Sequence, residues 1–152
     1  MTGRSRVFTL IILGFHAGLV SAQEYETKIN LFSGDPKGSH EAGSLTRVGS
    51  PVLGTKSGQE ASYLRGEQVV IGAQIVPVGL QVHVVAKDAG NGAILVNLTL
   101  ENSKLIGQKA PQVTSSKAQT TATVQSGSKL RLELGDDPKN KYWVEITIRK
   151  AK

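Results

Sequence analysis

The amino-acid sequence predicts an all-β protein, a small antiparallel sheet or sandwich domain of about seven or eight strands. Two observations lead to this fold class. Apolar and polar residues alternate with a period of two in short runs, and clusters of Gly, Asn, Asp and Ser separate these runs. No run of adequate length has helical periodicity. The chain also contains no cysteine, so core packing or association with copies of itself must hold the fold together.

The first 22 residues, MTGRSRVFTLIILGFHAGLVSA, are predicted to be a secretory signal peptide. Arginines stand at their start, an apolar core covers 7–20, and small residues end at Ala22, where signal peptidase would cleave. The core is too short for a permanent transmembrane helix, which needs about 20 apolar residues. We therefore expect export and a mature chain that starts at Gln23. An uncleaved N-terminal anchor is the alternative.

Residues 23–44 are predicted to form an N-terminal strand and a linker. ETKINLF (26–32) has the alternation of a strand. SGDPKGSHEAGS (33–44) has no large apolar residue and is typical of a flexible linker. We expect this linker to separate the first strand from a compact domain over residues 45–152.

The centre of that domain is predicted to be a β-hairpin. VGLQVHVVAK (78–87) and AILVNLTLE (93–101) alternate in the same way, and DAGNG (88–92) between them is rich in residues that tolerate positive φ. The preceding apolar run, EQVVIGAQIV (67–76), is expected to be one strand with a bulge or bend at Gly72. The apolar face of the hairpin consists of Val78, Leu80, Val82, Val84, Ile94, Val96, Leu98 and Leu100.

Further strands must cover this apolar face. Burial of each aliphatic side chain contributes about 1.5–3 kcal/mol, which only offsets the entropy lost when two strands become ordered. The candidates are TTATVQ (120–125), KLRLEL (129–134) and YWVEITIR (142–149). In the last run, Trp143 is expected on the face opposite the apolar row of Tyr142, Val144, Ile146 and Ile148.

No catalytic, metal or cofactor site is expected. A catalytic histidine needs an orienting acid and a nucleophile, and the sequence assigns neither to His83, which stands on the polar face of a predicted strand. A small hydrolase built around His83 is the minor alternative. The loop GDDPKNK (135–141) offers oxygen ligands, but their spacing matches no known calcium loop and Asp-Asp-Pro is common in turns. Those ligands would be Asp136, Asp137 and Asn140.

The charge of the chain does not point to nucleic acid. The formal net charge of +6 would fall to +4 once the two arginines of the signal peptide are removed, and the charges are spread along the chain. A nucleic-acid surface combines a basic stripe with aromatic residues. Aromatic residues make up only 5% of this sequence.

An ordered series of small residues gives the most specific signal. SPVLGTKSGQEASYLRGEQVVI (50–71) contains a proline before an extended run, a Gly-Gln-x-Ala turn, and a second glycine before an apolar run. Another glycine opens GLQVHVVAK (79–87), and two threonines open TTATVQSG (120–127). Over about residues 45–134 this order resembles the C-terminal homology domain of bacterial secretins, the outer-membrane ring proteins of type II and type III secretion systems and type IV pilus machinery. The matching residues, which we call the secretin-like series, are Pro51, Gly58, Gln59, Ala61, Gly66, Gly79, Thr120, Thr121, Val124 and Gly127.

Within this series we expect particular structural roles. Gly58 and Gly66 are predicted to be turns that set the register of the strands on either side. Pro51 is predicted to begin an extended segment at a position that needs no amide donor.

The sequence departs from the secretin pattern in two places. After the Thr-Thr segment, secretins usually continue into a Gly-Gly-Leu run and a loop of paired Leu-Gly motifs that helps to build the gate. Here LRLEL (130–134) passes through 135–141 to YWVEITIRKAK (142–152), which is similar to the closing strand of that family. We therefore expect a short version that lacks the gate motif. Only residues 23–44 precede the match, too few for the ring-building periplasmic domains.

The resemblance implies a secretin-like, non-enzymatic protein of the cell envelope, in the periplasm or the outer membrane. It would act in a type II or type III secretion system or a pilus-type system, with envelope proteins or copies of itself as partners. We expect contacts through strand edges and through the apolar face of the hairpin. The alternative is a free periplasmic or cell-surface β-sandwich that binds through its loops. If the hairpin face is buried within one chain, it provides no driving force for assembly through that face.

Overall fold

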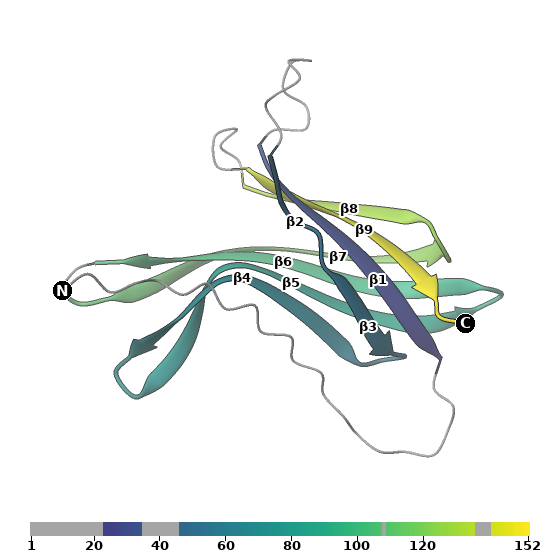
Figure 1. The fold of residues 1–152 in the computed structure, drawn as a ribbon, viewed down its shortest axis with the longest axis horizontal. Coiled ribbons are helices and arrows are strands. Elements are labelled where there is room, and N and C mark those ends of the chain that lie inside the picture. The colour runs from purple at the N-terminus through teal and green to yellow at the C-terminus, as the bar shows by residue number, and fades with distance from the viewer. Residues whose placement is uncertain (1–22, 35–45, 108, 136–140) are drawn as a thin grey trace.

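The structure, a computed structural model, describes residues 23–34, 46–107, 109–135 and 141–152. This part of the chain is all-β, with nine strands in two antiparallel sheets and no helix (Figure 1). The predicted fold class is therefore confirmed. No helix in these ranges is long and apolar enough to cross a membrane. The predicted signal peptide and most of the predicted linker lie outside the described residues.

The five-stranded sheet joins the beginning and the end of the described chain. Its order is β2-β1-β9-β8, and β3 also pairs with β1. Because β1 pairs with β9 along Tyr25–Ser33, the first strand is interior to the sheet and belongs to the same core as the strands after residue 45. The predicted strand at 26–32 is thus not separated from the compact domain. The strands are β1 (Glu24–Ser33), β2 (Thr46–Gly49), β3 (Val52–Lys56), β8 (Lys129–Leu134) and β9 (Tyr142–Lys150).

Pro51 divides one edge of this sheet into two short strands. β2 pairs with Leu31–Ser33 and β3 with Glu24–Lys28, so the two lie end to end along β1. Pro51 lies between them, has no N–H to donate, and accepts a hydrogen bond from the N–H of Ile29 at 2.9 Å. This division is one reason why the structure has nine strands instead of seven or eight.

The four-stranded sheet is a meander with the order β4-β5-β6-β7. Its second and third strands are the predicted hairpin, which is confirmed, with Val82 opposite Leu100 and Val84 opposite Leu98. Asn91 has a positive φ of 51° in the turn, as a tight hairpin turn requires. The strands are β4 (Glu60–Ile71), β5 (Gln74–Gly90), β6 (Ala93–Ile106) and β7 (Gln112–Gln125).

Two expectations about glycines were wrong. The run 67–76 is not one bent strand, because Gly72 has a φ of 63° and reverses the chain so that Ile71 pairs with Gln74. The aliphatic residues on both sides of this turn made the run look continuous. Gly66 is not a turn, since it lies inside β4.

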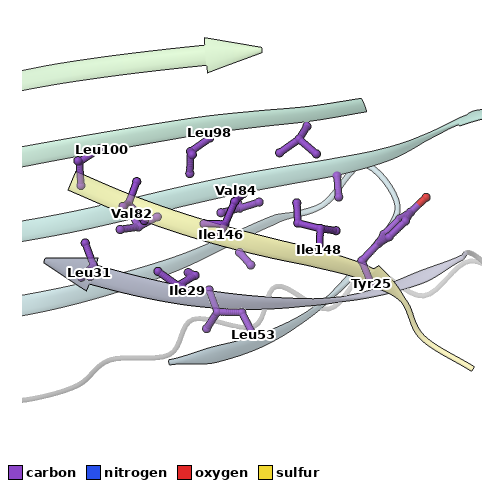
Figure 2. Packing of buried hydrophobic residues seen from close by; sticks show 14 of the residues in the cluster. Tyr25, Ile29, Leu31, Leu53, Val82, Val84, Leu98, Leu100, Ile146 and Ile148 are labelled. Carbon is purple, nitrogen blue, oxygen red and sulfur yellow. The ribbon is translucent and has the colours of Figure 1, made fainter. Parts of the chain in front are cut away.

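The hydrophobic core fills the space between the two sheets, where the five-stranded sheet crosses over the four-stranded one (Figures 1 and 2). Seven of the eight aliphatic side chains of the predicted hairpin face belong to this core, and the eighth, Val78, is also buried. The opposite sheet contributes Tyr25, Ile29, Leu31, Val144, Ile146 and Ile148. The apolar face of the hairpin is therefore covered within one chain.

Trp143 lies on the outer face of the five-stranded sheet, as predicted, yet only 5% of it is exposed. Its ring stacks on Phe32, with centroids 4.1 Å apart and planes 13° from parallel. The guanidinium carbon of Arg131 lies 4.4 Å from the Trp143 ring centroid, and that of Arg47 lies 5.6 Å from the Phe32 ring centroid. The four side chains come from adjacent strands, so the stack ties the short strands β2 and β8 to the centre of the sheet.

Candidate functional site

The four-stranded sheet ends in two long free edges. β4 has 12 residues and β7 has 14 residues, and within the described residues neither pairs on its outer side. Natural proteins usually protect such edges with prolines, bulges or charged side chains. Here neither edge strand contains a proline and both keep an unbroken register with their inner neighbours. β7 has one charged residue, Lys117, whereas β4 has three, Glu60, Arg65 and Glu67. These edges are open templates for pairing with another strand.

The two edges are complementary in direction and in facing. Each neighbouring pair in the sheet is antiparallel, so β4 and β7 run in opposite directions. One row of opposite residues crosses all four strands on the core side, and its ends are two residues of the secretin-like series. This row is Ala61, Val84, Leu98 and Thr120. If β7 of one copy lay beside β4 of another, the sheet would continue antiparallel with the same face inward.

The sheet forks at the end that carries the β4–β5 and β6–β7 turns, which we call the open end. Beyond the pair of Gly79 and Ser103, β5 and β6 no longer pair. β4 and β5 continue alone over residues 67–78, and β6 and β7 continue to pair over 104–106 and 112–114. Figure 1 shows these two hairpin tips diverging. We call them the β4–β5 tip and the β6–β7 tip.

A pair of glycines allows the bend at the base of the β4–β5 tip. Gly66 and Gly79 lie opposite each other, and both belong to the secretin-like series. A Cβ on Gly66 would overlap the carbonyl oxygen of Val78, and one on Gly79 would overlap that of Arg65. Gly79 also has a φ of 131°. The two backbones approach too closely here for any residue with a side chain.

Both tips expose large aliphatic side chains. On the β4–β5 tip, Val70 is 71% exposed and Ile75 is 67% exposed. On the β6–β7 tip, Leu105 and Ile106 are exposed as well. The stretch 68–78 contains no charged residue. Exposed aliphatic clusters of this kind mark contacts with a protein partner or a membrane.

The opposite end, which we call the closed end, contains both crossings of the chain between the sheets. The first crossing is the turn at Gly58, between β3 and β4, and the second is the turn at Gly127, between β7 and β8. Both glycines have positive φ, 79° and 88°. The Gly58 N–H donates to the carbonyl oxygen of Ala86 at 2.8 Å, and the Gly127 N–H donates to that of Ile148 at 2.7 Å. Each crossing is thereby fixed to a long central strand.

An ion pair adds to the connections at the closed end. Lys150 Nζ lies 3.3 Å from Asp88 Oδ2, and the Gly90 N–H donates to Asp88 Oδ1 at 2.9 Å. The Gly90 N–H, and after it Lys150, hold the pKa of Asp88 below its ordinary value. The backbone N–H of Lys150 donates to the Ser126 hydroxyl at 3.1 Å, beside the second crossing. These polar groups bond to one another, so their role is structural.

The secretin-like series does not form one cluster. Gly58 and Gly127 lie at the crossings, Gly66 and Gly79 at the bend, and Pro51 at the break between β2 and β3. Of the remaining residues, Gln59 closes the first crossing turn with its N–H on the Lys56 carbonyl, and the Thr121 hydroxyl links β7 to β6 by donating to Asn97 Oδ1 at 2.7 Å.

His83 has neighbours that sequence reasoning did not identify. Its Nδ1 lies 3.0 Å from Glu60 Oε1, and Ser62 is the residue opposite it across the β4–β5 ladder. The structure gives no hydrogen bond between Ser62 and His83, and the Glu60 side chain is 58% exposed. The geometry is that of an exposed hydrogen-bonded pair on the outer face of the sheet, without an arranged nucleophile.

No group of three or more acidic, histidine or cysteine side chains that could hold a metal occurs in the described part of the chain. The acidic and amide residues of the loop GDDPKNK fall outside it.

Ser103 is the residue at the fork that sequence reasoning missed. It follows the ordinary polar alternation of its strand, so the sequence contains no signal that separates it from Thr99.

Comparisons with known proteins show likeness in structure only. No family model and no curated protein matches the chain. One similar solved structure is the InvG secretin domain of the Salmonella SPI-1 injectisome, with a TM-score of 0.48 and 14% identity over 88% of this chain and 64% of that chain. A second is the type II secretion system secretin GspD of E. coli K12, with a TM-score of 0.49 and 13% identity over 86% and 48%. A third is Aeromonas hydrophila ExeD, with a TM-score of 0.48 and 12% identity over 86% and 46%. This chain thus spans less than two-thirds of each of them.

Proposed function

We propose that the chain is a secretin-like, non-enzymatic component of the cell envelope that takes part in a type II or type III protein secretion system or a pilus-type system. The observation that carries the proposal is the pair of long, proline-free and complementary edges on one four-stranded sheet. The secretin-like series supports it, because its residues shape this sheet, its bend and its two crossings.

In this proposal, copies join edge to edge, with β7 of one copy beside β4 of the next. The two edges differ, so the contact is heterologous, and an open row of copies keeps one free edge at each of its ends until it closes on itself. Backbone hydrogen bonds supply the attraction, since the unpaired N–H and C=O groups of one edge meet those of the other. A ring with one continuous sheet would result.

The apolar face of the hairpin does not take part, contrary to the expectation from the sequence. Val82, Val84, Val96 and Leu98 have no exposed surface, because the five-stranded sheet of the same chain covers them. Assembly through that face would require the sandwich to open. The edges and the tips are the surfaces that the proposal uses.

The tips are proposed to contact the outer membrane. Leu105 and Ile106 are flanked by Lys104 and Lys109, so aliphatic groups and cations occur together on the β6–β7 tip. That combination suits the boundary between acyl chains and anionic head groups. Export by a signal peptide cleaved before Gln23 is part of the same proposal.

The direction of the amides in β7 defines a test. The Gly79 N–H points toward β6, because it donates to Ser103 Oγ. Backbone amides alternate in direction along a strand and opposite residues alternate in pairing type. The backbone N–H of His83, four residues further along β5, therefore also points toward β6. His83 and Thr99, which lie opposite each other, then form a hydrogen-bonded pair. Gln119, which lies opposite Thr99 on the other side, then directs its N–H to the free edge of β7.

Gln119→Pro removes one outward donor and leaves the inner ladder intact. The native mass of the chain from residue 23 to 152 is the measurement. We expect assemblies for the parent chain and for the control Gln119→Ala, and monomers for Gln119→Pro. A parent chain that is strictly monomeric at all concentrations, with no envelope partner, would overturn the proposal and favour the free β-sandwich.

The membrane contact has its own test. Binding to phosphatidylglycerol vesicles should fall at least tenfold for Ile75→Asp, because a charge replaces an exposed aliphatic group on the β4–β5 tip. The control is Val52→Asp, at the fifth exposed large aliphatic position, which lies in β3 away from both tips. Equal binding by the two variants would remove the tips from the proposal.

A further inference from the structure

Ser103 occupies the point where the four-stranded sheet forks. It is the last residue of β6 that pairs with β5, and its partner is Gly79. Only 3% of Ser103 is exposed, whereas the other polar residues of this strand are half-buried or exposed. A buried hydroxyl at a branch point requires an explanation from its hydrogen bonds.

The hydroxyl contacts three backbone groups of the bent segment. Ser103 Oγ lies 3.2 Å from the Gly79 nitrogen, 3.2 Å from the Pro77 oxygen and 3.3 Å from the Gly79 oxygen. One hydroxyl accepts from the Gly79 N–H and donates its single proton to one of the two carbonyls at a time. These groups belong to the part of β5 that turns away from β6. Without the hydroxyl they would lose a partner where the ladder ends.

Burial alone does not produce such contacts in this protein. Thr27, the other buried polar residue in the described part of the chain, has a hydroxyl that makes no hydrogen bond. The Ser103 contacts therefore belong to the fork. Pro77 fits the same geometry, since it has no N–H and leaves only its carbonyl oxygen to be satisfied.

We propose that Ser103 is a positioning residue whose hydroxyl holds the Pro77–Gly79 segment in its bent path and so fixes the angle between the two tips. The opposed glycines Gly66 and Gly79 permit the bend, because no Cβ separates the backbones. The absence of a Cβ makes the bend possible but does not set the angle between the two tips. The hydroxyl selects it by satisfying Gly79 and Pro77 in the bent arrangement.

The use of this device rests on the proposed function. The exposed side chains Val70 and Ile75 lie on one tip, and Leu105 and Ile106 on the other. A fixed angle between the tips lets all four reach the same surface together. The bend itself can be measured whether or not the chain assembles.

The experiment compares the chain from residue 23 to 152 with three variants, Ser103→Ala, Ser103→Cys and Ser103→Thr, by amide hydrogen exchange. Ala removes the hydroxyl, Cys keeps nearly the same volume but is a weak hydrogen-bond donor, and Thr keeps the hydroxyl. For Ala and Cys we expect exchange at Gly79, at Val78 and across 74–76 to become roughly 3- to 10-fold faster, the loss of one hydrogen bond. Thr should exchange like the parent, and β9 amides should change in none of the variants.

Two results would overturn the proposal. Parent-like exchange at Gly79 in both Ala and Cys would show that the hydroxyl holds nothing. Equally fast exchange in Thr and Ala would assign the effect to packing. The Cys variant serves the same purpose if Ala fails to fold. A strictly monomeric parent chain with normal Ser103 dependence would reject the proposed function and leave the positioning role standing.

Discussion

The two ends of the sandwich are built in opposite ways. At the closed end, both crossings, the β5–β6 turn and the last residues of β9 are joined by backbone hydrogen bonds and by the pair of Asp88 and Lys150. At the open end, the four-stranded sheet divides into two tips whose aliphatic side chains have no cover. The closed end connects its turns and strand ends through polar contacts within the chain. The open end leaves apolar surface exposed and available to a binding partner.

This difference separates stability from interaction within one small domain. Local stability in proteins follows the number of buried contacts and satisfied hydrogen bonds, and surfaces that bind come from the less constrained regions. Changes at the bend and at the closed end should therefore lower the free energy of unfolding. Changes on the tips should leave it almost unchanged. Four predictions test this comparison.

The largest effect is expected at the bend, where the two regions meet. Gly79→Ala places a Cβ against the backbone of Arg65 and Gly66 and requires a φ of 131° that alanine avoids. We expect a loss of about 3 kcal/mol in the free energy of unfolding, measured by urea denaturation. Gly72→Ala is the matched control, since Gly72 also has a positive φ but no atom within 4 Å of its Cβ position. Equal losses for the two variants would contradict the role of close approach.

The second effect is expected at a crossing of the closed end. Gly127→Ala keeps free space around the new Cβ but forces a φ of 88° on alanine, which costs about 1 kcal/mol. Gly54→Ala is the control, because Gly54 in β3 has neither a positive φ nor a close neighbour. Thermal unfolding of both variants checks the expectation. A Gly127 variant as stable as the Gly54 variant would mean that the crossing does not constrain the chain.

A smaller effect is expected from acid at the closed end. The lowered pKa of Asp88 means that its ionised form is favoured in the folded state, by the Gly90 N–H first and by Lys150 second. Its stabilising contribution is present above the ordinary aspartate pKa of 3.8 and is lost as the pH falls below that value. Urea denaturation at pH 7 and pH 3 should show a smaller decrease for Asp88→Asn than for the parent. An identical decrease in the free energy of unfolding for the two proteins would show that Asp88 does not stabilise the closed end.

The smallest effect on stability is expected at the tips. Val70→Ser and Ile75→Ser replace side chains that are already mostly exposed, so each should change the free energy of unfolding by no more than about 0.5 kcal/mol. Leu98→Ser, in the core, is the contrasting variant and should be strongly destabilising. A large loss from either tip variant would show that the tips are packed in the monomer and would end the comparison.

The sequence predicted the elements formed by neighbouring residues. The β5–β6 hairpin follows from the alternation on both sides of a turn that tolerates positive φ, and the burial of its apolar face follows from the same pattern. The outward position of Trp143 could be predicted in the same way. Local alternation does not reveal that β1 pairs with β9 across most of the chain, so the first strand was expected outside the compact domain.

The parts of the site that the sequence did not reveal depend on distant residues. Gly66 and Gly79 could be recognised as a series, but only the register of β4 and β5 shows that they lie face to face. The pairing of Glu60 with His83 and the contacts of Ser103 also arise from register. The low charge of β7 is the one feature in the sequence that hints at a free edge available for pairing.

The order of the strands along the chain has a consequence for how this protein folds. The meander β4-β5-β6-β7 pairs only strands that follow one another, whereas the other sheet needs β1 to meet β9. Local pairings form faster than distant ones, so we expect the meander to form first and the β1–β9 ladder last. Pulse-labelled hydrogen exchange would reveal this as early protection at β5–β6 and late protection at β1–β9. During that interval the future core face of the meander would be uncovered, and its two edges would already be able to find a neighbour.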